Sequence, residues 1–307
     1  APQDALRQDM IEGLSRRTKA LAPKWFYDAE GSKLFEEITQ LPEYYPTRQE
    51  AALLRRVMPT WAKQFRSGAV LVELGPGASE KTRTVLDPAK DLSAYVPIDI
   101  SATALNEAAE RIRMDYPGLK VLPVVGDFEH LSPPPVEAGQ GRRIGFFPGS
   151  TIGNLEPDAA VTLLRSGRDV LGEGSLFILG VDLVKPAGTL VAAYDDAQGV
   201  TAAFNRNLLV RAYRELDMDF VPDDFAHVAV WNAAHSRMEM HLQATRSMTG
   251  HLGKLACRFA EGETIHTESP RKFDRASVEA LAEAAGWRLE AFEISDSASV
   301  ALALVSA

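Results

Sequence analysis

Cysteine is almost absent from this chain: Cys257 is the only one among 307 residues. A single thiol excludes an internal disulfide and leaves no second sulfur for a metal site built on paired cysteines. The six histidines follow no H-E-x-x-H motif and no other metal-ligand spacing. We therefore expect no bound metal ion.

An excess of positive charge and long apolar runs are also missing. The net charge of -9 argues against nucleic acid as the main partner, because nucleic-acid binding rests on clustered Lys and Arg. No apolar run approaches the roughly 18 residues that a membrane helix needs, and no signal peptide is recognisable. These absences predict a soluble, cytoplasmic protein without a membrane partner, which we expect to be a monomer.

The chain does contain a glycine turn behind an apolar strand. The run Ala69–Leu74 meets Gly75-Pro76-Gly77, and a polar segment that can start a helix follows. Glycines let the backbone approach a ligand closely, so the turn indicates a nucleotide cradle. Glu80 stands where the third glycine of G-x-G-x-x-G would fall, which disfavours a nicotinamide dehydrogenase. A turn that merely ends a core strand is the alternative.

Three acids lie at the predicted strand tips. Asp99 ends the next apolar run, 24 residues after Gly75, and can accept both ribose hydroxyls. Glu73 precedes Gly75 by two residues and suits a ligand with a cationic end, such as the amino and sulfonium groups of S-adenosylmethionine. Asp127 could take an adenine amino group while Phe128 lies beside the ring. The alternative for this last pair is a turn acid next to a core phenylalanine.

A fourth strand tip spans Phe146–Leu155 and is rich in small polar residues. Gly149 and Ser150 make poor core but a good floor for a reacting centre, and we expect both at the cofactor. The amide of Asn154 can orient an amine or a carboxylate.

Strand and helix signals alternate from residue 50 to 183, which predicts an α/β fold of the Rossmann-like type with a parallel sheet. The predicted strands are Val70–Leu74, Ala94–Ile98, Lys120–Val125, Arg143–Phe147 and Leu176–Val181. Between them, Ala102–Asp115 and Pro157–Leu171 have helical spacing of apolar residues.

The pattern changes after residue 184 and returns at Phe273. Thr201–Leu216 predicts a long helix, and alternating segments such as Arg237–Thr245 predict antiparallel strands. We therefore predict a sheet domain over 49–184 and 273–307, and a smaller α+β lobe built from 1–48 and 185–272.

Six segments resemble the L-histidine Nα-methyltransferases of ergothioneine biosynthesis. They are Trp25–Ala29, Leu41–Arg48, Glu73–Thr82, Gly149–Leu155, Tyr194–Asp196 and Phe204–Asn207. The resemblance covers about residues 24–245 and weakens afterwards. It implies a class I S-adenosylmethionine-dependent methyltransferase sheet with an inserted substrate-binding lobe.

The resemblance also implies roles for individual residues. Contacts to S-adenosylmethionine are implied for Gly75, Lys81, Asp99, Asp127 and Phe128, and we add Glu73, Gly77, Gly149 and Ser150 from the turn chemistry above. Contacts to the substrate amino acid are implied for Tyr27, Tyr44, Asn154, Tyr194, Met240 and Glu268. In this scheme Glu268 hydrogen-bonds the imidazole, and S-adenosyl-L-homocysteine is the second product.

The expected chemistry is an in-line displacement at a sulfonium, for which positioning and desolvation carry the rate. The α-amine must first lose its proton. Tyr44 or Asn154, or a water that they hold, could accept hydrogen bonds from the amine, and we expect these two residues to be catalytic.

The match fails at one informative place. The family has a serine two residues after the glutamate, whereas Pro270 stands there in this chain and has no hydroxyl. Either Ser269 serves instead or one imidazole contact is lost. The first hypothesis is thus Nα-methylation of L-histidine, through to histidine betaine. The second is the same reaction on another or a modified amino acid, and the third is an S-adenosylmethionine-binding regulator without catalysis.

Overall fold

The computed structural model describes residues 2–77, 79–128 and 131–307. Ala78, Glu129 and His130, which fall in or beside the predicted tips, lie outside the described residues. The chain divides into two compact units: unit 1 comprises Ala1–Tyr45 and Lys185–Arg271, and unit 2 comprises Pro46–Val184 and Lys272–Ala307. Residues 46–48 and 272 thus belong to unit 2, whereas the predicted boundaries put them in the smaller lobe.

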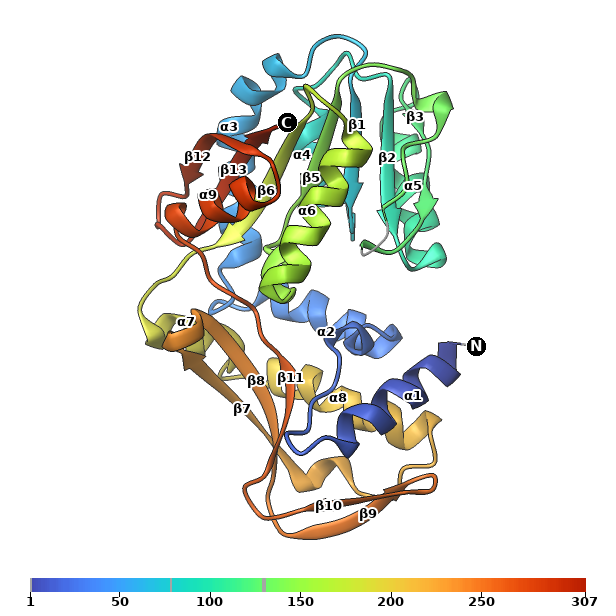
Figure 1. Cartoon of the computed structure of the whole chain (residues 1–307), viewed down its shortest axis with the longest axis vertical. Coiled ribbons are helices and arrows are strands. Elements are labelled where there is room, and N and C mark those ends of the chain that lie inside the picture. Colours follow the sequence, from blue (N-terminus) through green and yellow to red (C-terminus); the bar gives the residue numbers. More distant parts are fainter. Residues whose placement is uncertain (1, 78, 129–130) are drawn as a thin grey trace. The chain divides into compact units, whose positions relative to one another are not determined.

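Unit 2 is built on an eight-stranded sheet of order β12-β13-β6-β5-β1-β2-β3, with β4 pairing β2 (Figure 1). Its strands are β1 (Val70–Leu74), β2 (Ala94–Asp99), β3 (Lys120–Val121), β4 (Val124–Val125), β5 (Arg143–Phe147), β6 (Leu176–Asp182), β12 (Arg288–Ile294) and β13 (Val300–Ser306). All pairs among the first six strands are parallel, and β13 runs antiparallel to β6 and β12.

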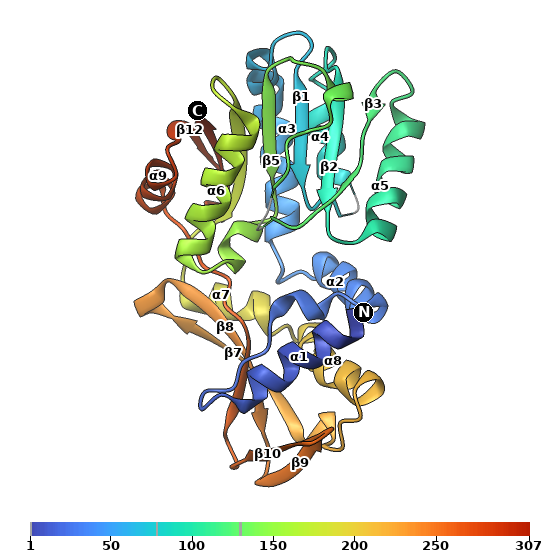
Figure 2. The same cartoon turned by 45° about the vertical axis from the view of Figure 1, so that its right-hand side comes forward.

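Helices cover both faces of this sheet. They are α3 (Pro46–Trp61), α4 (Glu80–Leu86), α5 (Ala102–Asp115), α6 (Pro157–Leu171) and α9 (Arg275–Ala284), with short turns η2 (Ala62–Gln64), η4 (Val136–Ala138) and η5 (Thr151–Asn154). In the view of Figure 1, α6 and α9 lie in front of the sheet and α3 lies behind it. Figure 2 shows α5 beside β2 and β3. Since β1 and β6 are covered on both faces, they are buried over their whole length and are apolar except for one acid each, Glu73 and Asp182.

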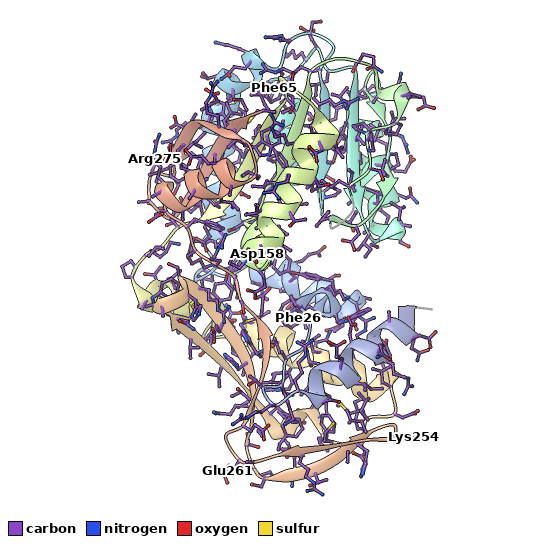
Figure 3. All side chains as sticks on the ribbon, viewed as in Figure 1. Phe26, Phe65, Asp158, Lys254, Glu261 and Arg275 are labelled. Atoms are coloured by element: carbon purple, nitrogen blue, oxygen red, sulfur yellow. The ribbon has the colours of Figure 1, made fainter. Side chains whose placement is uncertain are left out.

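Unit 1 combines helices with a three-stranded sheet of order β11-β8-β7 and a β9–β10 hairpin. Its elements are α1 (Pro2–Ser15), η1 (Pro23–Phe26), α2 (Ala29–Gln40), α7 (Ala187–Tyr194), α8 (Val200–Glu215), η6 (Pro222–Asp224), β7 (Phe225–Asn232), η7 (Ala233–His235), β8 (Arg237–Ala244), β9 (Met248–Leu252), β10 (Leu255–Phe259) and β11 (Thr264–Glu268). In Figure 3, Lys254 marks the turn between β9 and β10, and Glu261 follows β10 at the other end of the hairpin.

The predicted α/β fold is confirmed, and most elements agree with their predicted ranges. The segment 120–125 differs, because it contains Pro123 and divides into the two short strands β3 and β4. Proline has no N–H to donate to a ladder, which explains the interruption. Among the described residues, no helix is both long and apolar enough to cross a membrane.

Candidate active site

The turn after β1 forms a backbone surface at the carboxyl edge of the sheet. Gly75 and Gly77 have φ angles of +66° and +51°, which L side chains rarely adopt. A Cβ atom on Gly75 would lie 3.3 Å from the ring of Phe128, whereas one on Gly77 would meet no described atom within 4 Å. The turn therefore packs against Phe128 at its first glycine and is open at its second, as a ligand cradle requires.

Glu73 lies buried directly before this turn. Its Oε2 atom accepts hydrogen bonds from the Tyr95 hydroxyl at 2.6 Å and the Thr82 hydroxyl at 2.7 Å. Burial raises the pKa of the Glu73 carboxyl to about 7, although both hydrogen bonds act in the opposite direction. The carboxylate thus ties β1 to β2 and α4, and its direct contact with a cofactor stays a prediction.

Two large apolar side chains flank the acid at the tip of β2. Asp99 accepts a hydrogen bond from the Ser101 backbone at 2.9 Å, and burial raises its pKa. Ile100 is 69% exposed and Val125, which pairs with Asp99 in the sheet, is 60% exposed. Exposed apolar side chains beside a carboxylate suit a flat ring attached to a sugar diol. Both lie at predicted strand tips, yet neither is among the predicted site residues.

Lys81 is held by a residue that the sequence analysis did not single out. The Glu50 carboxylate, from α3, is buried and forms an ion pair with the Lys81 ammonium. It also accepts from the Gly149 backbone nitrogen, at 2.8 and 3.0 Å to its two oxygens. A Cβ on Gly180 would lie 1.7 Å from Glu50 Oε1, so the glycine inside β6 makes room for the carboxylate. In the sequence, only the glycine at position 180 within a largely apolar strand indicates that another side chain needs space there.

The tip of β5 turns through two residues with positive φ, Gly149 at +79° and Ser150 at +56°. The Ser150 hydroxyl accepts a hydrogen bond from the Asp182 backbone at 2.9 Å, which joins this turn to the end of β6. Asn154, half-buried, ends the short helix η5 that follows. Unit 2 therefore gathers the predicted cofactor residues at one sheet edge, and Asn154 belongs to this unit.

Unit 1 brings the three predicted substrate-binding tyrosines into one row of aromatic rings. The ring of Tyr27 lies 5.7 Å from that of Phe35, Phe35 lies 6.3 Å from Tyr44, and Tyr44 lies 6.5 Å from Tyr194, measured between centroids. All three pairs are edge-to-face, a favourable arrangement for aromatic rings. Tyr44 and Tyr194, 150 positions apart, are therefore neighbours, and Phe35 links Tyr27 to them.

A β-bulge sets the face on which Glu268 lies. His266 pairs with His241 across the β8–β11 ladder, but Glu268 pairs with Met240, so the extra residue Thr267 shifts the register. Directly opposed residues share a face, and the bulge thus places Glu268 on the face of Met240. Desolvation of its hydroxyl and the nearby Glu268 carboxylate both raise the pKa of Tyr27, although the residue as a whole is 47% exposed. Glu268, which is predicted to hydrogen-bond the substrate side chain, therefore lies near Met240 and Tyr27.

A buried histidine supports the backbone of Tyr194. His227 Nε2 lies 2.7 Å from the Tyr194 carbonyl oxygen, and its Nδ1 lies 2.9 Å from Asn205 Nδ2. Since a carbonyl only accepts, Nε2 carries the proton and Nδ1 accepts from the Asn205 amide. The amide orientation is fixed independently, because Nδ2 also donates to the His241 carbonyl at 3.0 Å. Burial lowers the pKa of His227, in keeping with a neutral ring.

The same asparagine reaches the bulge. The Thr267 hydroxyl lies 2.6 Å from Asn205 Oδ1 and 3.0 Å from the Met240 carbonyl. Asn205 belongs to the Phe204–Asn207 segment, whose role the sequence did not reveal. It connects α8 with the strands that carry Met240 and Glu268.

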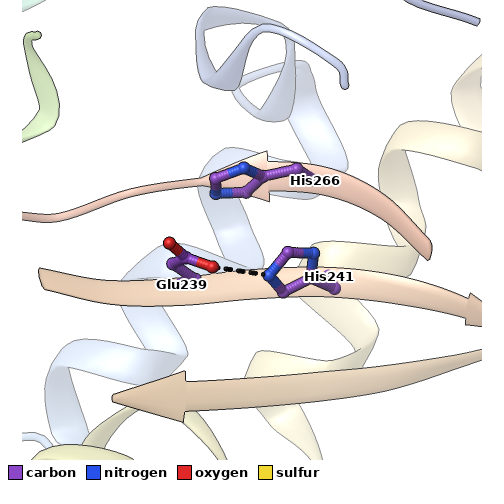
Figure 4. A group of neighbouring side chains, drawn as sticks. All are labelled: Glu239, His241 and His266. Carbon is purple, nitrogen blue, oxygen red and sulfur yellow. Dashed lines mark hydrogen bonds and ion pairs between the residues drawn. The ribbon is translucent and has the colours of Figure 1, made fainter. Parts of the chain in front are cut away.

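Three side chains on the opposite face of β8 and β11 could hold a metal ion: Glu239, His241 and His266 offer ligand atoms within 4.8 Å of one another (Figure 4). The expectation that the histidines lack metal geometry is therefore incomplete. However, Glu239 already accepts from Arg237 at 2.8 Å, and the two imidazole rings are stacked with an interplanar angle of 24°. Lone pairs of nearly parallel rings do not converge on one ion, so the arrangement fits a hydrogen-bonded group better than a metal centre.

The sheet order and the cradle at its carboxyl edge define a class I S-adenosylmethionine-dependent methyltransferase fold. An S-adenosylmethionine-dependent methyltransferase from Clostridium acetobutylicum has a similar structure, with a TM-score of 0.52 and 11% identity, over 91% of this chain and 99% of that one. At this identity the likeness shows the fold alone.

Residues 6–307 match the family described as histidine-specific, S-adenosylmethionine-dependent methyltransferases, and the chain belongs to this family. The histidine N-alpha-methyltransferase of Mycolicibacterium smegmatis is 47% identical over 294 residues, which cover 93% of this chain and 89% of the relative. Ergothioneine biosynthesis protein 1 of Neurospora crassa is 28% identical over 270 residues, 85% of this chain but 30% of that longer protein.

Proposed function

We propose that the protein methylates the α-amino group of free L-histidine with S-adenosylmethionine, three times in succession, to give histidine betaine for ergothioneine biosynthesis. The observation that carries the proposal is the 47% identity, over 93% of the chain, to a relative named for this activity. The Neurospora crassa relative supports the pathway. We further propose that the protein acts as a cytoplasmic monomer.

The residues at the sheet edge of unit 2 fit S-adenosylmethionine. The open backbone at Gly77 leaves room for its amino-acid portion, Asp99 suits the ribose hydroxyls, and Ile100 and Val125 suit the adenine faces. Bound there, S-adenosylmethionine supplies an electrophilic methyl group on a sulfonium. Lys81 and Gly149 would be placed for it by Glu50, and Asp127 and Phe128 complete the proposed set.

The tyrosine row of unit 1 fits the polar end of an amino acid. Phenolic hydroxyls donate and accept, so Tyr44 and Tyr194 can bind a carboxylate, while Tyr44 and Asn154 can accept from an amine. In the first two methylations, hydrogen bonds accepted from the N–H groups of the neutral amine orient its lone pair toward the methyl group. Glycine and serine near the reacting centre leave space for the added methyls.

The decisive experiment offers the protein S-adenosylmethionine with each of the twenty amino acids and measures mass gains of one to three methyls. L-histidine is expected to gain three. Methylation of another amino acid, with histidine unchanged, would favour the second hypothesis, that the substrate is another or a modified amino acid. Pro270, which lacks the hydroxyl of the family's serine, is the reason to consider it. No methylation at all would leave a binding protein or a modified substrate. Light scattering of the purified protein measures its molar mass and tests whether it is a monomer.

Glu268→Ala provides a matched test of the substrate assignment. The variant is expected to weaken L-histidine binding while S-adenosylmethionine binding stays near wild type, because the removed carboxylate belongs to the substrate set alone. Equal loss of both affinities would contradict the assigned role.

A further inference from the structure

The segments Trp25–Ala29 and Phe204–Asn207, far apart in the chain, meet in unit 1 around Tyr27. Tyr27 is a predicted substrate contact and is 47% exposed, although Phe26 before it is fully buried. Tyr27 and Asp28 form the whole connection between η1 and α2, so their neighbours decide where the tyrosine lies. What docks these neighbours therefore bears on the proposed substrate site.

One face of α8 holds the connection. Side chains three and four positions apart share a helix face, and four such side chains contact this segment: Phe204, Asn207, Arg211 and Arg214. Phe204 stacks on Phe26, with ring centroids 4.5 Å apart and an angle of 22° between the rings. Arg211 Nη1 donates to the Trp25 carbonyl at 3.0 Å. The residues immediately before Tyr27 are thus docked on α8.

Asp28 anchors the other side of Tyr27. Its Oδ1 atom accepts a hydrogen bond from the Gly31 backbone nitrogen at 2.8 Å, which caps α2, and another from the Asn207 amide at 2.8 Å. Its Oδ2 atom pairs with the Arg214 guanidinium at 2.8 Å. Although burial acts in the opposite direction, these hydrogen bonds lower the pKa of the Asp28 carboxyl, which is therefore ionised at neutral pH.

The close fit of this corner requires glycine at position 31. A Cβ atom on Gly31 would lie 1.7 Å from the Phe26 carbonyl oxygen and 3.2 Å from Asn207 Nδ2. The first turn of α2 therefore lies directly against the end of η1 and against α8. Since both ends of the two-residue connection are held, the backbone of Tyr27 is held with them.

The Tyr27 ring is left half-exposed by this arrangement. It packs edge-to-face against Phe35 and Phe204, with centroids 5.7 and 5.8 Å apart. The Glu268 carboxylate is close enough to raise the pKa of Tyr27, together with desolvation of the hydroxyl. A binding contact is most effective when packing and hydrogen bonds behind it fix its geometry in advance. Buried neighbours on both sides of a half-exposed ring fit this description.

We propose that Asp28 is a positioning residue for substrate binding: bonded to Asn207, it fixes the backbone of Tyr27, so that the tyrosine ring is in place before the amino acid binds. The inference rests on the proposed function, which assigns Tyr27 to the substrate. A contact fixed in advance loses little conformational entropy on binding, so its support should affect KM for the substrate. The buried bond to Asn207 carries this role, because the Arg214 side chain is 52% exposed and exposed ion pairs contribute little.

Asp28→Ala tests the role. We expect KM for L-histidine to rise about 2- to 12-fold, the range that one net hydrogen bond represents. The kcat and the KM for S-adenosylmethionine should stay within about twofold of wild type. Asp28→Asn keeps Oδ1 for Gly31 and Asn207 and loses only the exposed ion pair, so its KM for L-histidine should stay within about twofold of wild type. Asp274→Ala is the matched control: it removes an aspartate that caps α9 in unit 2 and should leave both KM values unchanged.

Tyr27→Ala shows whether Asp28 acts through the tyrosine. A positioning residue can lose no more than the residue that it positions, so the double variant with Asp28→Ala should match Tyr27→Ala alone. Additive losses, or an unchanged KM for L-histidine in Asp28→Ala, would overturn the inference. If Asp28→Ala does not fold, Asn207→Ala, which removes one of its bonds, decides by the same criteria.

The wild-type protein separates this inference from the proposed function. If it methylates another amino acid and leaves histidine unchanged, the proposed function fails, and the KM for that amino acid decides the role of Asp28 in the same variants. If it methylates none of the twenty amino acids, the proposed function is overturned and this inference with it.

Discussion

The Glu50 carboxylate accepts a hydrogen bond from the Gly149 backbone nitrogen at 2.8 Å, across 99 positions of the chain. The same carboxylate pairs with Lys81, so one buried acid positions two predicted cofactor residues on different elements. A buried charge is tolerated only when it is paired and hydrogen-bonded, and here both conditions hold. Glu50 is therefore part of the cradle's support.

Glu50→Gln is expected to lower the free energy of unfolding by about 2–4 kcal/mol, because it leaves the Lys81 ammonium without its buried partner. The KM for S-adenosylmethionine should rise with it. Asp296→Asn is the matched control: it breaks the exposed ion pair that Arg56 makes from the same helix, α3. Exposed pairs contribute little, so chemical denaturation should barely detect this change. Equal losses in the two variants would refute the supporting role.

Glu73 makes stability depend on pH. Its pKa is about 7 in the folded protein against an ordinary value of 4.5 for glutamate, so the folded state binds the proton more tightly than the unfolded state. The stability that this proton contributes is fully present below pH 4.5 and is lost as the pH rises through 7. The loss is about 3 kcal/mol.

Glu73→Gln should remove this dependence while its side-chain oxygen still accepts from Tyr95 and Thr82. Urea unfolding of both proteins at a series of pH values measures the difference. Between about pH 4.5 and 8, the free energy of unfolding of the variant should increase relative to that of the wild type. A difference that stays constant with pH would show that the carboxyl titrates normally.

The sheet of unit 2 could be predicted from the sequence because its strands are buried, apolar and regularly spaced. Glu50 could not, since its contacts with Gly149 and Lys81 are long-range and depend on a missing side chain at Gly180. Nothing in the local sequence of α3 distinguishes this acid from a solvated one.

Strand β11 illustrates a second limit. The run Thr264–Glu268 is polar at most positions, so no apolar alternation marks it as a strand. The resemblance pointed to Glu268 nevertheless, but only the register shift explains why this side chain shares a face with Met240. Residues that act through backbone carbonyls, such as His227, leave no sequence pattern at all.

Removal of metal ions should not affect the reaction. Arg237 balances the charge of Glu239, and the stacked rings of His241 and His266 do not converge on one point. Dialysis against EDTA, followed by assay in metal-free buffer, should leave kcat unchanged. A loss of activity that Zn²⁺ restores would make these three residues a metal centre and would contradict the hydrogen-bonded arrangement.

His227 allows the support of the substrate residues to be tested apart from the substrate contacts. His227→Phe removes the hydrogen bonds that His227 makes with the Tyr194 carbonyl and the Asn205 amide, which should lower the free energy of unfolding by about 0.5–1.5 kcal/mol for each bond. Because Tyr194 loses its anchor, the KM for L-histidine should rise while the affinity for S-adenosylmethionine stays near wild type. The exposed His235→Phe should change neither quantity. Calorimetry with each ligand measures the two affinities. A variant that is less stable yet binds L-histidine as tightly as wild type would show that the buried bond to Tyr194 serves the fold and not the substrate.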